Sequence, residues 1–481
     1  MAMAGWWVGL ALAIPWLAGA LWVRALWRDA PAGVWSLALG YGYILGLLSV
    51  TLLLRVQAAV GWPLDFTAPL AVMMLLALAG GWRTWRRRGA NAGQPLNGDW
   101  RGQPLWQWLL FAVLLGWLGW RFATLAQEVW LRPLYPWDAW TTWAVRPRVW
   151  AELRELTPFV APHLWLTDPT GSVYTIDAWT YPYTVPLLTL WPTLAFGAWN
   201  ETAANLPWIG AALALGLGFY GQARRWGATP LIALIFTWLL LSLPLLDTHV
   251  ALAGYADLWL ATVFGLAVIA FFQWARTGDR WQGVLAVLLA LACPLIKLEG
   301  AVWLLLLVPA LLTAWLRGWP LRVLAATAAL LGVVWWAVDG VEFTLPGLGE
   351  FRLKPELIQV PYLGLFNLGY RGTWEPVWKN VLILANWHLF GYLALIAAGW
   401  TLRAAAHGLA ERWRWVELAL VSASLLALFV LFFLTDAQRW AEQYTSINRV
   451  FLEFIPALLF WTLTVVVPSC STCRPVQRLP E

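Results

Sequence analysis

Residues 254 to 275 read GYADLWLATVFGLAVIAFFQWA, and this stretch decides the class of the protein. Apart from Asp257 the run carries no charge, and it is long enough to cross a hydrocarbon core of about 30 Å as an α-helix. A helix satisfies all its backbone polar groups within one segment, as a lipid environment requires. The stretch therefore predicts a membrane-spanning helix with one acidic residue at its start.

Comparable apolar runs recur along nearly the whole chain. Of the 481 residues, 61% are hydrophobic and only 12% are charged, whereas a soluble domain averages about 25% charged residues. We therefore predict an all-α polytopic transmembrane helical bundle of about thirteen spanning helices. The predicted spans lie at about 4–26, 33–54, 66–82, 104–126, 203–222, 228–246, 254–275, 281–296, 299–316, 321–338, 379–402, 415–435 and 448–467.

The basic residues predict the orientation of these spans. Alternating the spans places 18 Lys and Arg residues on one side and four in the short loops of the other. Because cytoplasmic loops are enriched in Lys and Arg, the first side is predicted to be cytoplasmic and the N-terminus to lie outside. The net charge of +6 then reports topology, and we assign no nucleic-acid partner. The 18 are Arg24, Arg28, Arg83, Arg86, Arg87, Arg88, Arg101, Arg224, Arg225, Arg276, Arg280, Arg317, Arg322, Arg403, Arg412, Arg414, Arg474 and Arg478, and the four are Arg55, Lys297, Arg439 and Arg449.

Residues 183–199 are apolar but are not counted as a span. Pro186 and Pro192 interrupt them, and a full crossing here would invert every later loop and move the arginines outside. We predict an interfacial or re-entrant helix within a long outer loop at about 127–202. A second outer loop is expected at about 339–378, and loops of this length are usually functional.

The first long loop opens with an aromatic stretch around one acidic residue. Residues 135–148 read YPWDAWTTWAVRPR, so Asp138 follows a predicted span and precedes Arg146 and Arg148. A half-buried carboxylate can act as a general base, and guanidinium groups beside it can hold a phosphate. An interfacial Asp solvated beside a helix end is the structural alternative.

Three more polar stretches fall on the same predicted side. They are PLLDTHVALAGYAD at 244–257, KLEG at 297–300 and QRWAEQYTSINR at 438–449. Each has a structural alternative, since an acid can complement a helix dipole, a Lys and a Glu can neutralise each other, and an Arg can reach lipid headgroups. Ionisable groups at membrane depth are costly and usually functional, so their convergence favours a site. The candidate residues are His249, Tyr255, Asp257, Lys297, Glu299, Arg439 and Arg449.

These motifs together resemble the bacterial membrane glycosyltransferases of the GT-C superfamily. The superfamily includes the protein O-mannosyltransferases and the aminoarabinose transferase of lipid A, and its first outer loop carries an essential acidic residue followed by juxtamembrane helices. The resemblance implies a GT-C-like core at 101–340 with the catalytic outer loop at 127–202. Residues 1–100 would form an N-terminal three-helix extension, and 341–481 a further outer loop and C-terminal helices.

The resemblance implies transfer of a sugar from a polyprenyl-phosphate carrier to an envelope glycan, lipid or protein. The reaction would occur at the periplasmic face of a bacterial inner membrane. Asp138 would act as the base in a single inverting displacement. Arg146, Arg148 and Lys297, with Arg439 or Arg449, would neutralise the carrier phosphate, where charge develops as the bond breaks. His249, Tyr255, Asp257 and Glu299 would bind the sugar or the acceptor.

Other functions remain open at this point. A transporter or flippase for a lipid-linked or small polar substrate is the main alternative, although no internal repeat of the kind common in transporters is visible. A structural envelope subunit would leave Asp138 and Lys297 without a role, and a ligase of the O-antigen type would need an outer loop rich in Arg and His. No ligand spacing demands a metal, so a divalent cation such as Mg²⁺ or Mn²⁺ is left open as a cofactor.

Overall fold

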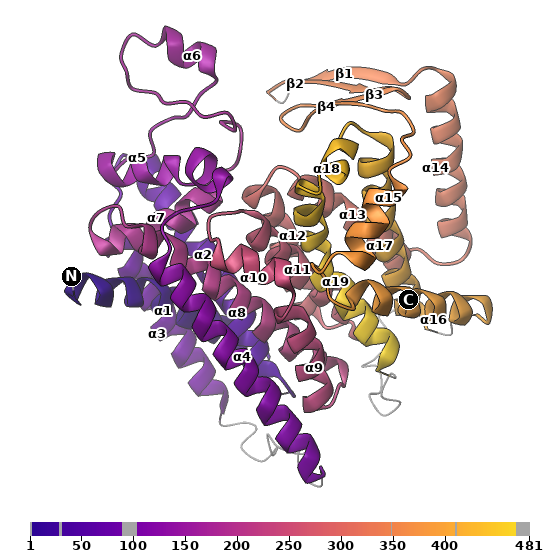
Figure 1. The fold of residues 1–481 in the computed structure, drawn as a ribbon, viewed down its shortest axis with the longest axis horizontal. Helices are drawn as coiled ribbons and strands as arrows, with labels where there is room; N and C mark the ends of the chain where they lie inside the picture. The colour runs from indigo at the N-terminus through magenta and orange to yellow at the C-terminus, as the bar shows by residue number, and fades with distance from the viewer. Residues whose placement is uncertain (1, 28–30, 89–102, 348, 409–410, 468–481) are drawn as a thin grey trace.

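The computed structural model describes residues 2–27, 31–88, 103–347, 349–408 and 411–467, and this part of the chain is mostly helical, at 73% helix (Figure 1). The long or apolar helices are α1 (Ala2–Arg24), α2 (Val34–Ala59), α3 (Thr67–Arg88), α4 (Leu105–Leu131), α8 (Glu201–Trp226), α9 (Pro230–Leu241), α10 (Pro244–Ala251), α11 (Asp257–Thr277), α12 (Arg280–Ile296), α13 (Gly300–Trp315), α14 (Trp319–Ala337), α16 (Phe390–Ala406), α17 (Arg412–Phe429) and α19 (Ser446–Val466). Shorter helices are α5 (Val145–Leu153), α6 (Pro162–Thr167), α7 (Thr184–Phe196), α15 (Trp374–Trp378) and α18 (Gln438–Glu442).

Eight helices of the described chain are long and apolar enough to cross a membrane, or nine if α9 and α10 form one broken span. The expected count of about thirteen is not confirmed. Helices α12, α13 and α16 have only 17, 16 and 17 residues, or about 24–26 Å at 1.5 Å per residue, which is short of a hydrocarbon core of about 30 Å. Helix α3 ends in the basic run 83–88, so its apolar part is shorter than the helix.

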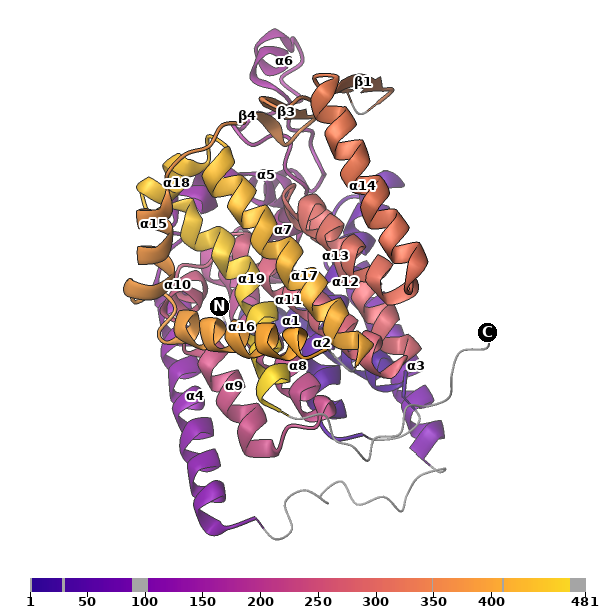
Figure 2. The ribbon, with the colours of Figure 1, turned by 90° about the vertical axis from the view of Figure 1, so that its right-hand side faces the viewer.

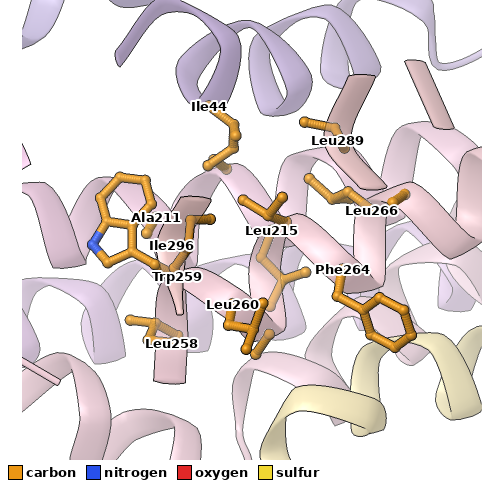
Figure 3. Close-up of a cluster of buried hydrophobic side chains, with 14 of the residues drawn as sticks. Ile44, Ala211, Leu215, Leu258, Trp259, Leu260, Phe264, Leu266, Leu289 and Ile296 are labelled. Atoms are coloured by element: carbon orange, nitrogen blue, oxygen red, sulfur yellow. The ribbon is translucent and has the colours of Figure 1, made fainter. Parts of the chain in front are cut away.

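Helix α11 forms the centre of the bundle. Every residue from Asp257 to Gln273 is buried, and a helix that is apolar all round packs inside a protein. Figure 3 shows its side chains, among them Trp259 and Phe264, beside Ile44 of α2, Leu215 of α8 and Leu289 of α12. Helix α2 of the N-terminal part packs against this centre, and its Tyr41 hydroxyl donates a hydrogen bond to the Leu266 carbonyl of α11 at 2.8 Å.

Helix α7 carries the segment expected to lie at the membrane interface. It has 13 residues, or about 20 Å, which is too short for a full crossing. Twelve of those residues are buried, and the Trp191 indole N–H donates to the Ala11 carbonyl of α1 at 2.6 Å. The segment therefore packs against α1, α2 and α8, which cover its apolar surface, and its expected interfacial or re-entrant position stays a prediction.

Several connections lie at two opposite ends of the bundle. Helix α6, the sheet and α18 lie at the upper end in Figure 1, and the same grouping appears in the turned view of Figure 2. The start of α4 and the turn between α8 and α9 lie at the opposite end. The connections named here thus lie at separate poles, and which pole is outside stays a prediction.

The second outer loop contains a sheet, so the all-α expectation is wrong for this segment. The strands β1 (Val341–Leu345), β2 (Gly349–Leu353), β3 (Leu357–Val360) and β4 (Gly364–Asn367) form an antiparallel meander in the order β1-β2-β3-β4. Phe343 opposes Phe351 across β1 and β2, and their rings stack with centroids 5.0 Å apart. Such aromatic cross-strand pairs stabilise short strands, which are too brief to give a clear signal in sequence.

Candidate functional site

A cavity of about 300 Å³ is lined by residues of the predicted outer loops and of the helices beside them. It collects residues from the long loop, from the start of α11, from the turn between α12 and α13, and from the start of α19. The site therefore exists only in the folded bundle. The lining residues are Asp138, Thr142, Trp143, Ala178, Tyr181, Asp257, Lys297, Glu299, Trp440, Ser446, Arg449 and Val450.

Arg449 connects two of the acidic residues in this cavity. Its Nη1 lies 2.6 Å from Asp138 Oδ2, and its Nη2 lies 2.8 Å from Asp257 Oδ2. Its guanidinium also covers the Tyr255 ring, with Cζ 4.6 Å from the ring centroid. A planar guanidinium has five donors in a fixed fork, so it can hold two carboxylates and an aromatic face at once.

Lys297 holds a second group of carboxylates. Its Nζ lies 3.1 Å from Asp257 Oδ1, 3.4 Å from Glu453 Oε1 and 3.5 Å from Glu299 Oε1. Burial alone would lower the pKa of Lys297, but the three neighbouring carboxylates outweigh burial and hold that pKa well above its ordinary value. Asp257 is fully buried between Lys297 and Arg449, so it links the two cations.

Two glycines allow the segments of the site to meet. Gly254 has a φ of +118°, and a Cβ on it would collide with Cβ of Ala139, the residue after Asp138. Gly300 follows Glu299, and a Cβ there would collide with the backbone carbonyl of Cys293. The GYAD and KLEG motifs thus need glycine because backbones or small side chains approach them closely.

Asp138 immediately precedes a π-helical turn, Ala139–Trp143, and its side chain is one-third exposed to the cavity. Single π-helical turns occur often at functional sites, where they re-aim side chains. Tyr181 also lines the cavity, and its hydroxyl donates to Glu299 Oε1 at 3.2 Å. Burial, followed by the charge of Glu299, raises the pKa of Tyr181, so its hydroxyl stays a proton donor at neutral pH.

The structure gives the predicted cations different positions. Lys297 and Arg449 line the cavity, whereas Arg146 is fully buried and donates to the carbonyls of Tyr181, Trp179 and Ala178 at 2.7, 2.5 and 3.3 Å. Burial lowers the pKa of Arg146 to about 10, so it remains a cation at neutral pH. Arg148 is exposed and lies 3.6 Å from Glu152.

The other predicted residues lie at or beyond the edge of the site. Arg439 is exposed and does not line the cavity. His249 is buried behind Tyr255, with ring centroids 5.2 Å apart, and its Nδ1 lies 2.8 Å from the Leu245 carbonyl. Tyr255 contacts Arg449 through its ring face, and burial raises the pKa of its hydroxyl.

Glu453 belongs to the site but was not among the predicted residues. It is fully buried about two turns into α19, and Trp303 Nε1 of α13 donates to its Oε2 at 2.5 Å. A single Glu inside the apolar run of α19, four residues after Arg449, was the signal that could have identified it. Among the described residues, no three His, Cys, Asp or Glu side chains are placed to hold a metal ion together.

The fold and the cavity define a helical, membrane-embedded protein with a buried ionic cluster at one pole. No family model matches this chain. No curated protein matches it either, and no solved structure does.

Proposed function

We propose that the protein is a membrane glycosyltransferase that moves a sugar from a polyprenyl-phosphate carrier to an acceptor hydroxyl. The observation that carries the proposal is Asp138, a carboxylate exposed to a cavity and paired at 2.6 Å with Arg449, which is itself anchored on the buried Asp257. A base, a phosphate-binding cation and a substrate-sized space are therefore side by side. This is the set of groups that the resemblance to GT-C enzymes calls for.

The carrier phosphate would bind to Arg449 and Lys297. Of the predicted cations, these two line the cavity, and the arginine offers a bidentate fork to phosphate oxygens. A phosphate on Arg449 would compete with Asp138 for the same N–H groups. Donor binding would therefore release Asp138 Oδ2 to accept a proton, while Asp257 keeps the guanidinium in place.

The chemical step follows from this arrangement. The acceptor hydroxyl loses its proton to Asp138 as its oxygen attacks the anomeric carbon and forms the new glycosidic bond. The bond from that carbon to the phosphate oxygen breaks, and the electron pair leaves with polyprenyl phosphate. Arg449 and Lys297 stabilise the charge that develops there, and the displacement inverts the anomeric centre.

In this mechanism Arg146 is a positioning residue instead of a phosphate ligand. It holds the carbonyls of residues 178–181, and this segment supplies Ala178 and Tyr181 to the cavity wall. Arg148 and Arg439 have no part in the reaction. Tyr181 and Glu299, which also line the cavity, would bind sugar or acceptor hydroxyls.

A transporter for a lipid-linked or small polar substrate is the second candidate. The 62° bend between α9 and α10 favours it, because transporters often bind substrate where helices are interrupted. Proteoliposomes distinguish the two functions. A transporter moves labelled carrier between leaflets without consuming it, whereas a transferase releases polyprenyl phosphate.

The test compares envelope glycans by mass spectrometry in cells that lack the gene and carry one variant each. Wild type and Asp177→Asn, an exposed acid in the same loop, should restore the missing glycan. Asp138→Asn should restore at most a hundredth of it, because general-base assistance is worth roughly 10²- to 10⁴-fold. Full restoration by Asp138→Asn would rule out the proposed base.

A further inference from the structure

A second cavity lies at the pole opposite Asp138, between α16, α17 and α19. Its volume is about 120 Å³, and its floor carries Glu417 of α17 and Thr464 of α19. Helix α17 begins at Arg412 on the basic side and runs toward α18, which reaches the first cavity through Trp440. The second cavity is thus separate from the proposed active site.

Glu417 is buried, at 4% exposure, and lacks most of its hydrogen bonds. Its Oε1 has no hydrogen-bond partner among the described residues. The Thr464 hydroxyl lies 3.2 Å from Oε2 but 2.8 Å from the Trp461 carbonyl, and its single proton can serve only one of them. A buried carboxylate without donors is costly, so a ligand that supplies N–H or O–H groups would stabilise the charged form of Glu417.

The rest of the cavity selects a cation. Trp400, Trp413 and Trp461 line it, and aromatic faces attract ammonium groups. Arg414 also lines it, with its guanidinium over the Trp413 ring at 5.1 Å from the centroid. A ligand with a positive donor for Glu417 and an adjacent negative group for Arg414 complements both charges.

The size of the cavity and its depth in the membrane restrict the ligand further. The cavity of about 120 Å³ leaves room for a small polar group such as an ethanolamine unit. Residues 412–415 read RWRW, a basic and aromatic turn typical of the headgroup region, and Glu417 lies just beyond it. Trp400, at 55% exposure, stands on the outer surface of α16, where lipid would meet the cavity.

We propose that this cavity binds the headgroup of a phosphatidylethanolamine from the adjoining leaflet. The primary ammonium donates to Glu417 between the tryptophans, and the lipid phosphate pairs with Arg414. Phosphatidylcholine is excluded, because its quaternary ammonium is bulkier and has no N–H to donate. Phosphatidylglycerol offers the phosphate but no cation.

Native mass spectrometry of the purified full chain tests this proposal. The protein is equilibrated with equal amounts of phosphatidylethanolamine, phosphatidylcholine and phosphatidylglycerol that share the same acyl chains. We expect wild type to retain phosphatidylethanolamine about tenfold over the other two, as one hydrogen bond to a charged group would give. Glu417→Gln should lose this preference, whereas Glu442→Gln, the same change at an exposed residue, should keep it.

Two further measurements separate the contribution of the phosphate from that of the ammonium group. Arg414→Gln should lower retention of phosphatidylethanolamine and phosphatidylglycerol alike, because both carry the phosphate. If free O-phosphoethanolamine displaces the lipid at low millimolar concentration, the ligand of the cavity is a free small molecule instead of a lipid headgroup, and the proposal is overturned. Equal retention of all three lipids by wild type, or an unchanged preference in a folded Glu417→Gln protein, would overturn the proposal.

Discussion

Arg449 on α19 contacts Asp138 at 2.6 Å and Asp257 at 2.8 Å through different nitrogens of one guanidinium. Asp138 comes from the long loop after α4, and Asp257 starts α11. One side chain thus joins two acids from distant parts of the chain. Any change at one acid therefore alters the environment of the other.

Replacing Arg449 should damage both stability and donor binding. Arg449→Gln leaves the fully buried Asp257 with one cation, and breaking a buried ion pair costs about 3–5 kcal/mol of unfolding free energy. Arg449→Lys should recover only part of it, because a lysine ammonium cannot reach two carboxylates as a fork. Thermal unfolding in detergent measures the effect. Arg439→Gln, an exposed neighbour, should stay within about 0.5 kcal/mol of wild type, and an equal loss there would contradict the assignment.

Lys297 and Glu453 should show strong coupling. Lys297→Met leaves Asp257 and Glu453 buried near each other without their shared cation. Removing the second charge in Lys297→Met/Glu453→Gln should restore part of the stability, with a coupling energy of about 1–3 kcal/mol in a double-mutant cycle. Additive losses would mean that the two side chains do not interact in the folded protein.

Gly254→Ala should displace the segment that carries Asp138. Its Cβ would collide with Ala139, in addition to the strain of a φ of +118°. Gly364→Ala is the matched control, since Gly364 has a φ of +116° but no heavy atom lies within 4 Å of the place its Cβ would take. We expect Gly254→Ala to unfold at a clearly lower temperature than Gly364→Ala. Equal unfolding temperatures would show that the close approach to Ala139 is unimportant.

Arg146 and Arg148 should behave differently despite their proximity in sequence. Arg146→Gln removes the donors of three carbonyl contacts and should increase amide hydrogen exchange across residues 176–183. Arg148→Gln, at a side chain that is 64% exposed, should leave exchange unchanged. If Arg148→Gln reduced donor affinity and Arg146→Gln did not loosen the loop, the roles given above would be reversed.

The orientation in the membrane has a direct test. In a background without the native cysteines, Thr170→Cys in the long loop should react with an impermeant maleimide on intact cells whose outer membrane is permeabilised. Thr277→Cys, at the exposed last residue of α11, should react only after the inner membrane is opened. The reverse pattern would place the Asp138 cavity on the cytoplasmic side.

The sequence predicted the helical class well, because long apolar runs have one stable structure in lipid. Its count of about thirteen spans is not confirmed, since α12 and α13 are apolar but have only 17 and 16 residues, and their length depends on the turn at Lys297. It missed the sheet at 341–367, whose strands have four or five residues and gain stability from cross-strand pairs. Such pairing forms only in the folded segment, so the amino-acid composition of these strands gives little indication of it.

The site could be predicted in part. Asp138, Asp257, Lys297, Glu299 and Arg449 were identified because ionisable groups are rare in apolar surroundings, and they do line one cavity. Arg146 is also an ionisable residue in apolar surroundings, but it donates to backbone carbonyls of the long loop instead of lining the cavity. That contact depends on the folded path of the loop, which the sequence does not reveal. Glu453 was overlooked because it lies inside a helix, where sequence alone does not say which face meets a neighbour.

The dependence of this cluster on α19 has a consequence for biosynthesis. Asp257 and Lys297 enter the bilayer as α11 to α13 are made, long before the ribosome reaches Arg449 and Glu453. Until then Asp257 and Lys297 pair only with each other, and the incomplete cavity is exposed to lipid or to the insertion machinery. The arrival of α19 closes it by supplying one more cation and one more acid. A nascent chain stalled before residue 446 would therefore be recognisable to membrane quality control by its uncovered charges.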